Sequence, residues 1–154
     1  MANNNFDKKF CIVGLNKKQK IYPTVLPNNV EIVFNNMDKV LQQSKFAVTC
    51  SGTATLEVAL YNVPQVVVYK TNKINYFIGK RLIKVAYISL PNLIANQKIV
   101  AELIQDACTA KNIEQELDKL ENEGTNYYDV QNQLKSADSV SYQVANVLFN
   151  LALQ

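Results

Sequence analysis

Five short runs of β-branched and aromatic residues, separated by stretches that can be helical, most constrain what this chain can fold into. They are FCIV at 10–13, VEIVF at 30–34, FAVTC at 46–50, QVVVY at 65–69 and YISL at 87–90. Several are apolar throughout rather than alternating, as expected of strands buried on both faces of a parallel sheet. Their alternation with helical stretches predicts an α/β fold with a doubly wound, mostly parallel, Rossmann-like sheet.

The strand signal ends at Pro91, and the rest of the chain has the patterns of helices. Helices are predicted over residues 97–107, 111–122 and 138–152. We therefore divide the chain into an α/β region, residues 1–122, and C-terminal helices, residues 123–154. The last helix carries apolar positions that need a surface to cover them, namely Val140, Val144, Val147, Leu148 and Leu151.

Composition excludes several classes of function. The 154 residues contain no histidine, which removes the usual catalytic triads, the commonest general base and the commonest metal ligand, so no metal site is expected. A net charge of +3 is too small to indicate nucleic acid. Neither GxGxxG nor GxxxxGK[ST] occurs, which excludes the dinucleotide fingerprint and the P-loop.

Cysteine usage and apolar segments bear on the cellular compartment. Cys11, Cys50 and Cys108 are odd in number and form no CxxC, and we interpret them as buried thiols of a reducing compartment. The first ten residues, MANNNFDKKF, lack the apolar region of a secretory signal, and no apolar run approaches the length of a membrane span. We expect a cytoplasmic protein, or one attached to a membrane from the cytoplasmic side.

The stretch Ser51-Gly52-Thr53 lies between a predicted strand and a helix whose apolar positions are Leu56, Ala59 and Leu60. Ser51 or Thr53 can cap this helix, and Gly52 lets the backbone approach a ligand closely. Unpaired N–H groups at a helix start can hold a phosphate, and Glu57, one turn on, can accept hydrogen bonds from ribose hydroxyls. Spacing alone favours the other interpretation, a capped helix start with a glutamate that the helix dipole stabilises.

Two further stretches are candidates for binding. Pro91-Asn92 follows a predicted strand, where open α/β sheets bind ligands; Asn92 either contacts a substrate or stabilises its own loop. On a helix, residues 69–87 would carry an apolar stripe and a basic, aromatic-flanked face. This face either meets an anionic membrane or lipid or is simply solvated. Its residues are Lys73, Phe77, Lys80, Arg81 and Lys84.

Together these stretches have a family likeness. SGTATLEVALYNVPQVVVYKTN, followed by FIGKRLIKVAYISLPNLIANQKIVAELIQDAC, resembles the C-terminal half of the bacterial lipid-A-disaccharide synthases, inverting glycosyltransferases of GT-B architecture. The resemblance runs from about residue 10 to about residue 120 and is densest over residues 50–108. It implies transfer of 2,3-diacylglucosamine from its UDP derivative to 2,3-diacylglucosamine 1-phosphate in lipid A biosynthesis, without a metal or other cofactor.

The resemblance also assigns roles to individual residues. Ser51, Gly52 and Thr53 would contact the UDP diphosphate, and Glu57 would bind the ribose hydroxyls. Asn92 matches a functionally important asparagine near the sugar–phosphate end of the donor, and Gln105, in the following predicted helix, is a candidate for the same region. Residues 1–122 would then be a nucleotide-donor-binding domain that lacks its first βα unit.

The family pattern is incomplete in this sequence. The acceptor domain, expected to supply the general base, and an arginine-bearing GSR-type loop have no counterpart. We expect the chain alone to be inactive and to bind UDP weakly. It would be a piece of a larger enzyme, one subunit of a split UDP-sugar glycosyltransferase, or a non-catalytic interaction module that kept the fold.

Partners follow from the same resemblance. We expect the UDP moiety of the donor, an anionic membrane surface and a second copy of the chain, which would dimerise through the C-terminal helices. The expected location is the cytoplasmic face of a Gram-negative inner membrane.

Overall fold

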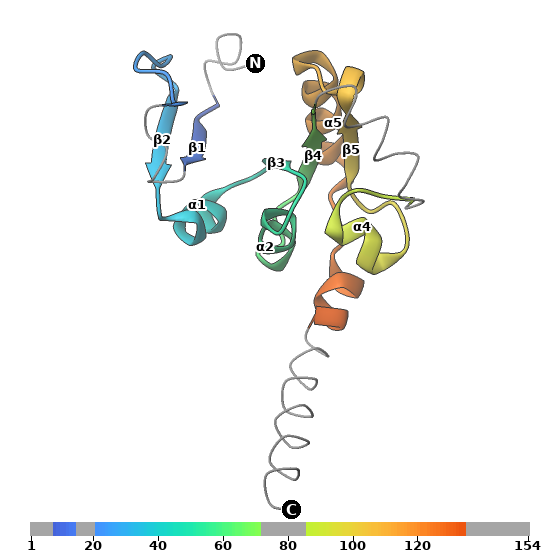
Figure 1. Ribbon diagram of the computed structural model, residues 1–154. Coiled ribbons are helices and arrows are strands. Elements are labelled where there is room, and N and C mark those ends of the chain that lie inside the picture. The colour runs from blue at the N-terminus through green and yellow to red at the C-terminus, as the bar shows by residue number, and fades with distance from the viewer. Residues whose placement is uncertain (1–7, 15–20, 72–85, 135–154) are drawn as a thin grey trace, which may run out of the picture.

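The computed structural model describes residues 8–14, 21–71 and 86–134 as two parallel sheets with helices packed on them (Figure 1). In the first sheet, β1 (Phe10–Gly14) pairs in parallel with β2 (Val30–Phe34), with Phe10 opposite Val30. In the second, β4 (Gln65–Tyr69) lies between β3 (Ala47–Cys50) and β5 (Ala101–Ile104), and all three strands are parallel. The predicted parallel α/β fold is confirmed.

The described helices follow the strands in the alternating order that a parallel sheet requires. They are α1 (Met37–Gln43), α2 (Ala54–Leu60), α4 (Leu90–Ala95), the 3-10 helix Gln105–Ala107 and α5 (Ala110–Glu123). α2 contacts β3, β4 and α4, whereas α5 contacts β4 and β5. Helical turns continue over residues 128–134. The helix predicted over 111–122 is confirmed as α5, and that over 138–152 lies outside the described residues.

The position predicted for the fifth strand is wrong. Residues 87–90 (YISL) form no strand, because α4 begins at Leu90 with Pro91 in its first turn. The strand instead lies at Ala101–Ile104, within the predicted helix 97–107, where Val66 pairs with Ala101. KIVAELI carries β-branched residues together with helical spacing. Pairing with β4 decides between the two patterns, because local propensity is weaker than tertiary context.

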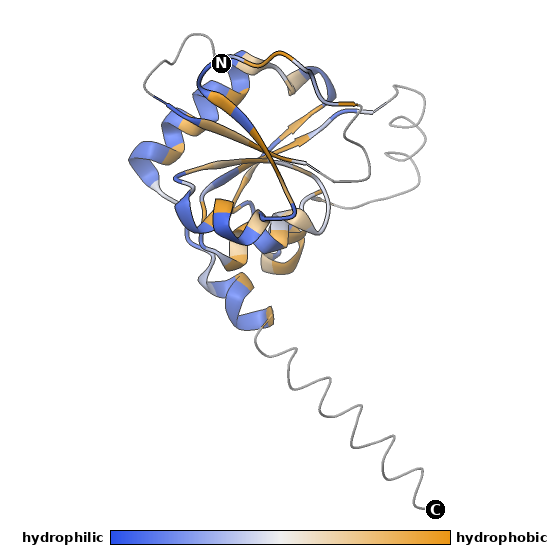
Figure 2. Cartoon of the chain, turned by 90° about the vertical axis from the view of Figure 1, so that its left-hand side faces the viewer, coloured by the Kyte–Doolittle hydropathy of each residue, from blue (hydrophilic) through white to orange (hydrophobic). Residues whose placement is uncertain are grey.

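Burial shows how the core is divided. Adjacent residues Val66 and Val67 of β4 point to opposite faces and are both fully buried, so this strand is covered on both sides. Ala59 of α2 packs with Val67, Val100 and Tyr127. A second cluster joins α1 and α2 through Leu41, Val58 and Val63. In Figure 2 the strands at the centre carry most of the hydrophobic colour, and α5 turns a hydrophilic side outward.

Two details of the predicted burial are corrected. The buried residues of α2 are Thr55, Val58 and Ala59, whereas Leu60, which was expected on the apolar face, is 52% exposed. β3 is not buried on both faces, because Val48 is 48% exposed and Cys50 is exposed. The expectation of three buried thiols is therefore wrong for Cys50; Cys11 and Cys108 are half-buried.

Candidate functional site

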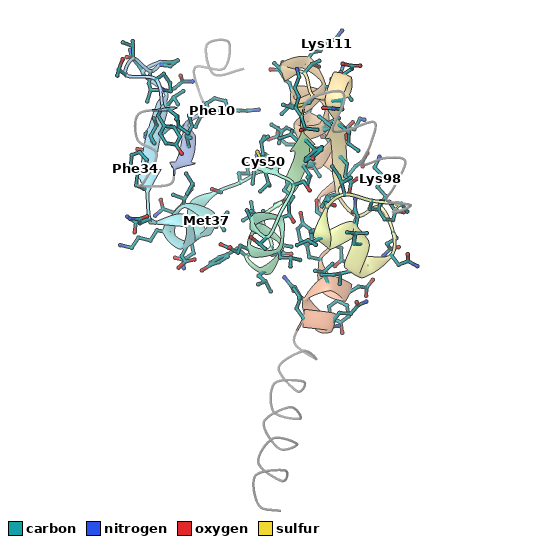
Figure 3. All side chains as sticks on the ribbon, in the orientation of Figure 1. Phe10, Phe34, Met37, Cys50, Lys98 and Lys111 are labelled. Carbon is teal, nitrogen blue, oxygen red and sulfur yellow. The ribbon has the colours of Figure 1, made fainter. Side chains whose placement is uncertain are left out.

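The Ser51-Gly52-Thr53 turn lies at the carboxyl end of β3, where parallel α/β sheets bind their ligands (Figure 3 labels Cys50 at the end of this strand). The Ser51 amide donates to the Val68 carbonyl and extends the pairing of β3 with β4 by one residue. Gly52 then takes φ = +148°, a conformation that L side chains rarely adopt. Thr53 already has helical dihedrals, so the chain passes from strand to helix within three residues.

Three consecutive amides are open, two in this turn and one at the first residue of α2. Among the described residues, the N–H groups of Gly52, Thr53 and Ala54 have no hydrogen-bond acceptor, whereas the amides of Thr55 and Leu56 bond back to the carbonyls of Gly52 and Thr53. Gly52 and Thr53 are also exposed. Successive unpaired N–H groups in a tight turn form a concave donor surface that suits an anion.

The hydroxyl groups of the turn are arranged differently from the capping expectation. Thr53 occupies the N-cap position, but its side chain makes no capping hydrogen bond. Ser51 does not cap α2 either, since its Oγ donates to the Ile88 carbonyl at 2.8 Å. Instead, Thr55 Oγ1 closes the first turn by donating to the Gly52 carbonyl at 2.6 Å. The Thr53 hydroxyl therefore stays available to a ligand.

The Ser51 hydrogen bond joins the two motifs that the sequence separates by more than thirty residues. It connects the Ser51-Gly52-Thr53 turn to the segment 88–92, which leads into α4. Contacts between α2 and α4 continue this junction. The structure therefore brings Ser51, Gly52, Thr53 and the segment that contains Asn92 to one place.

Asn92 is fully buried and uses its whole hydrogen-bonding capacity within the protein. Its Oδ1 accepts from the amides of Ile99, at 2.8 Å, and Val100, at 2.9 Å. Its Nδ2 donates to the Val100 carbonyl, at 3.0 Å, and to Glu102 Oε1, at 2.8 Å. Of the two interpretations open from the sequence, stabilisation of its own loop is the one that these contacts show.

Glu102 is a site residue that the sequence reasoning missed. From β5, its carboxylate accepts hydrogen bonds from the Ile88 and Ser89 amides, from Ser89 Oγ and from Asn92 Nδ2. The error followed from assigning residues 97–107 to a helix, on which Glu102 would have been a solvated residue. The available signal was a single acidic residue inside the apolar run IVAELI.

Gln105 lies in the 3-10 helix after β5, with φ = +52°, and not in the α-helix in which the sequence placed it. Its Oε1 accepts from the Thr71 amide at 2.8 Å, and its Nε2 donates to the Thr71 carbonyl at 3.1 Å. The side chain thus fixes the backbone that leaves β4. Glu57, by contrast, is exposed in the first turn of α2 and forms no ion pair with the described residues.

A buried hydrogen-bond network links α2 to the strands β3 and β4. Thr49 Oγ1 donates to Gln65 Oε1 at 2.8 Å, and Gln65 Nε2 donates to the Thr55 carbonyl at 2.9 Å. Tyr127 packs beside this network, and burial raises the pKa of its hydroxyl to about 12 against a smaller opposing effect of Gln65 and Thr125. Gln131 Nε2 donates to the Ala59 carbonyl and ties the following helical turns to α2.

Several expectations fall outside this geometry. Lys73, Phe77, Lys80, Arg81 and Lys84, expected to contact a membrane or lipid, lie outside the described residues. Within the described ranges, no three His, Cys, Asp or Glu side chains are grouped to hold a metal ion. In the same part of the chain, no helix has the length and apolar character needed to cross a membrane.

Parallel α/β sheets with a polar turn at the carboxyl end of a strand define the class of Rossmann-like α/β domains. Comparison with known sequences shows which family within this class the chain belongs to. A model of the lipid-A-disaccharide synthetase family matches residues 4–150, so the chain belongs to that family.

Individual relatives agree with the family match. The lipid-A-disaccharide synthase of Wigglesworthia glossinidia brevipalpis is 41% identical over 118 residues, which are 76% of this chain and 29% of that protein. That of Psychromonas ingrahamii is 45% identical over 115 residues, 70% of this chain and 30% of that protein. That of a Sulfurihydrogenibium species is 48% identical over 75 residues, 49% of this chain and 19% of that protein. The chain thus spans less than a third of the length of these relatives.

Proposed function

We propose that this chain is the UDP-binding, C-terminal half of a GT-B lipid-A-disaccharide synthase. The reaction is transfer of 2,3-diacylglucosamine from its UDP derivative to 2,3-diacylglucosamine 1-phosphate. The observation that carries the proposal is the open turn: the family match covers residues 4–150, and within it Gly52, Thr53 and Ala54 present three amides without acceptors among the described residues.

The chemistry assigned to the turn is the stabilisation of charge. Glycosyl transfer from a nucleotide donor leaves negative charge on the departing diphosphate. Fixed N–H donors aimed at that charge lower the barrier without reorganising during the reaction. In our proposal the Gly52, Thr53 and Ala54 amides and the Thr53 hydroxyl bind the diphosphate. The exposed Glu57 carboxylate, one turn further on, accepts hydrogen bonds from the ribose hydroxyls.

Ser51, Asn92 and Gln105 support the same site in different ways. Because the Ser51 hydroxyl and the whole Asn92 side chain are engaged within the protein, we assign both to positioning the junction between the turn and segment 88–92. Gln105 holds Thr71 through two hydrogen bonds and so fixes the end of β4 beside the turn. These roles require no direct contact between the three side chains and the donor.

Membrane attachment and self-association belong to the same proposal. Lys73, Phe77, Lys80, Arg81 and Lys84 would meet the anionic inner membrane of a Gram-negative bacterium from its cytoplasmic side. The apolar positions of residues 138–152 would pair two copies of the chain. Both proposals rest on sequence patterns and family likeness.

Titration of the isotope-labelled chain with UDP, followed by amide NMR, tests the proposed site. We expect the resonances of Gly52, Thr53 and Ala54 to shift at millimolar UDP, while uridine, which lacks the diphosphate, leaves them in place. A Glu57→Gln variant should still shift these resonances with inorganic pyrophosphate but should bind UDP more weakly. Unchanged turn resonances at millimolar UDP would contradict the proposal.

A further inference from the structure

The Glu102 carboxylate is surrounded by hydrogen-bond donors from a single segment of the chain. Its Oε1 lies 2.9 Å from the Ser89 amide, 2.6 Å from Ser89 Oγ and 2.8 Å from Asn92 Nδ2. The Ile88 amide is shared between the two carboxylate oxygens, 3.2 Å from Oε1 and 3.1 Å from Oε2. Among the described residues, no lysine or arginine forms an ion pair with it. The charge of Glu102 is therefore stabilised by the N–H and O–H groups that precede and begin α4.

These contacts connect Glu102 to the open turn indirectly, through segment 88–92. Glu102 fixes the Ile88 and Ser89 amides, and the Ile88 carbonyl accepts the Ser51 hydroxyl at 2.8 Å. Through Asn92, the same carboxylate is also linked to Val100, which directly precedes its own strand, β5. Segment 88–92 is thus held from β5 on one side and holds the turn on the other.

The negative charge of Glu102 argues against direct contact with the donor diphosphate. A carboxylate beside a diphosphate would repel it, whereas Glu102, which accepts from two backbone amides and from the Ser89 and Asn92 side chains, acts on the geometry of those donors. We propose that Glu102 is a positioning residue, which fixes segment 88–92 and, through Ser51, the orientation of the Gly52–Ala54 amides toward the donor diphosphate. This inference rests on the proposed function, and it adds a residue that acts through others.

The contacts rank the substitutions of Glu102. Glutamine can keep its carbonyl oxygen at the Oε1 position with all four of its donors, and loses only the second bond of the Ile88 amide, to Oε2. Alanine removes every contact and leaves the Ser89 and Asn92 donors without their acceptor. A positioning role therefore predicts that Glu102→Ala is much more harmful than Glu102→Gln, whereas a role of the negative charge itself predicts that both are equally harmful.

The test uses the full chain and measures two quantities: the amide resonances of the turn without ligand, and the Kd for UDP. In the free protein, Glu102→Ala should shift the Ser51 and Gly52 amide resonances, and Glu102→Gln should shift them less. With UDP, we expect Glu102→Ala to raise Kd about tenfold and Glu102→Gln about twofold. Asp118→Ala, on the exposed side of α5, is the matched control and should change neither measurement.

A double-mutant cycle with Ser51→Ala separates positioning from independent effects. If Glu102 acts through Ile88 and Ser51, the double variant should bind UDP no more weakly than Glu102→Ala alone. Full additivity, or unmoved Ser51 and Gly52 resonances in Glu102→Ala, would overturn the inference. Should Glu102→Ala fail to fold, the Glu102→Gln and Ser51→Ala pair gives the same cycle.

The two proposals fail separately. Absence of UDP binding by the unmodified chain would overturn the proposed function, and the ligand-free resonances would then still decide whether Glu102 positions the turn. Normal UDP binding by a folded Glu102→Ala variant would overturn the positioning role and leave the proposed function intact.

Discussion

The turn at residues 51–53 and the segment at residues 88–92 look alike in the sequence and differ in the structure. Both place small polar residues where a ligand site was expected, and both immediately precede or open a helix. In the turn and at Ala54, the first residue of α2, three amides and the Thr53 hydroxyl lack partners among the described residues. In segment 88–92, by contrast, the Asn92 side chain makes four hydrogen bonds to the protein.

This difference teaches that a polar motif does not by itself identify the groups that bind a ligand. Hydrogen-bonding capacity already used inside the protein contributes to the scaffold, while unused capacity at the surface is what a ligand can engage. The turn is therefore the proposed binding surface, and segment 88–92 is the support that holds it in place.

The largest effect is expected at the support. Asn92→Ala leaves the Ile99 and Val100 amides without their acceptor, so it should lower the free energy of unfolding by about 3 kcal/mol. Urea denaturation measures the change. Asn122→Ala, at an exposed position of α5, is the control and should have little effect. A loss well below about 1 kcal/mol for Asn92→Ala would remove the distinction between support and binding surface.

A smaller loss of stability is expected at Gly52. An added Cβ would meet no atom within 4 Å, so Gly52→Ala costs only the strain of φ = +148°, about 1 to 2 kcal/mol. Gly124→Ala is a matched control, because Gly124 also has a positive φ, +69°, and open space around it. Both variants should lose stability, but UDP affinity should fall in Gly52→Ala alone. Equal UDP affinity in the two variants would argue against the turn as the diphosphate site.

Tyr127 tests the core that the two regions share, since it packs with Ala59 of α2 and with Val100 beside Asn92. Burial raises the pKa of its hydroxyl from 10.0 to about 12. Its contribution to stability is therefore complete below pH 10 and is lost as the pH rises toward 12, because the unfolded chain ionises first.

Denaturation across this alkaline range checks the prediction. Tyr127→Phe should remove this part of the pH dependence, and it should be tolerated at neutral pH because the hydroxyl has no hydrogen-bond partner among the described residues. An unchanged alkaline profile in Tyr127→Phe would show that another group controls it.

The smallest effect on stability is expected at Thr53. Thr53→Val removes a hydroxyl that caps nothing, so the free energy of unfolding should stay within about 0.5 kcal/mol while UDP binds about threefold more weakly. Thr55→Val removes the hydroxyl that closes the first turn and should cost about 1 kcal/mol. If Thr53→Val were the less stable of the two variants, the assignment of the two hydroxyls would be reversed.

Much of the fold could be predicted because the local composition of most strands indicates a strand. Runs such as VEIVF and QVVVY are apolar, β-branched and flanked by turns, and β2 and β4 occupy their predicted positions. β5 could not be predicted in the same way, because IVAELI also has helical spacing, and pairing with β4 is information that a local window lacks.

The site was predictable to the extent that it depends on chain order. A turn after β3 lies at the carboxyl edge of the sheet, and Ser51, Gly52 and Thr53 lie between β3 and α2 as predicted, while their role in binding stays a prediction. The contact between Ser51 and Ile88, and the role of Glu102, depend on which strand lies beside which. The helical spacing of residues 97–107 predicts neither of them, and it predicts an α-helix for Gln105, which lies in a 3-10 helix.

Hydrogen exchange at the individual amides tests the contrast between the two regions most directly. The account predicts that Gly52, Thr53 and Ala54 exchange rapidly in the free chain and are slowed by UDP, whereas the amides of Ile99 and Val100, held by Asn92, exchange slowly in both states. Turn amides that are already protected without ligand, or that exchange at the same rate with and without UDP, would contradict it.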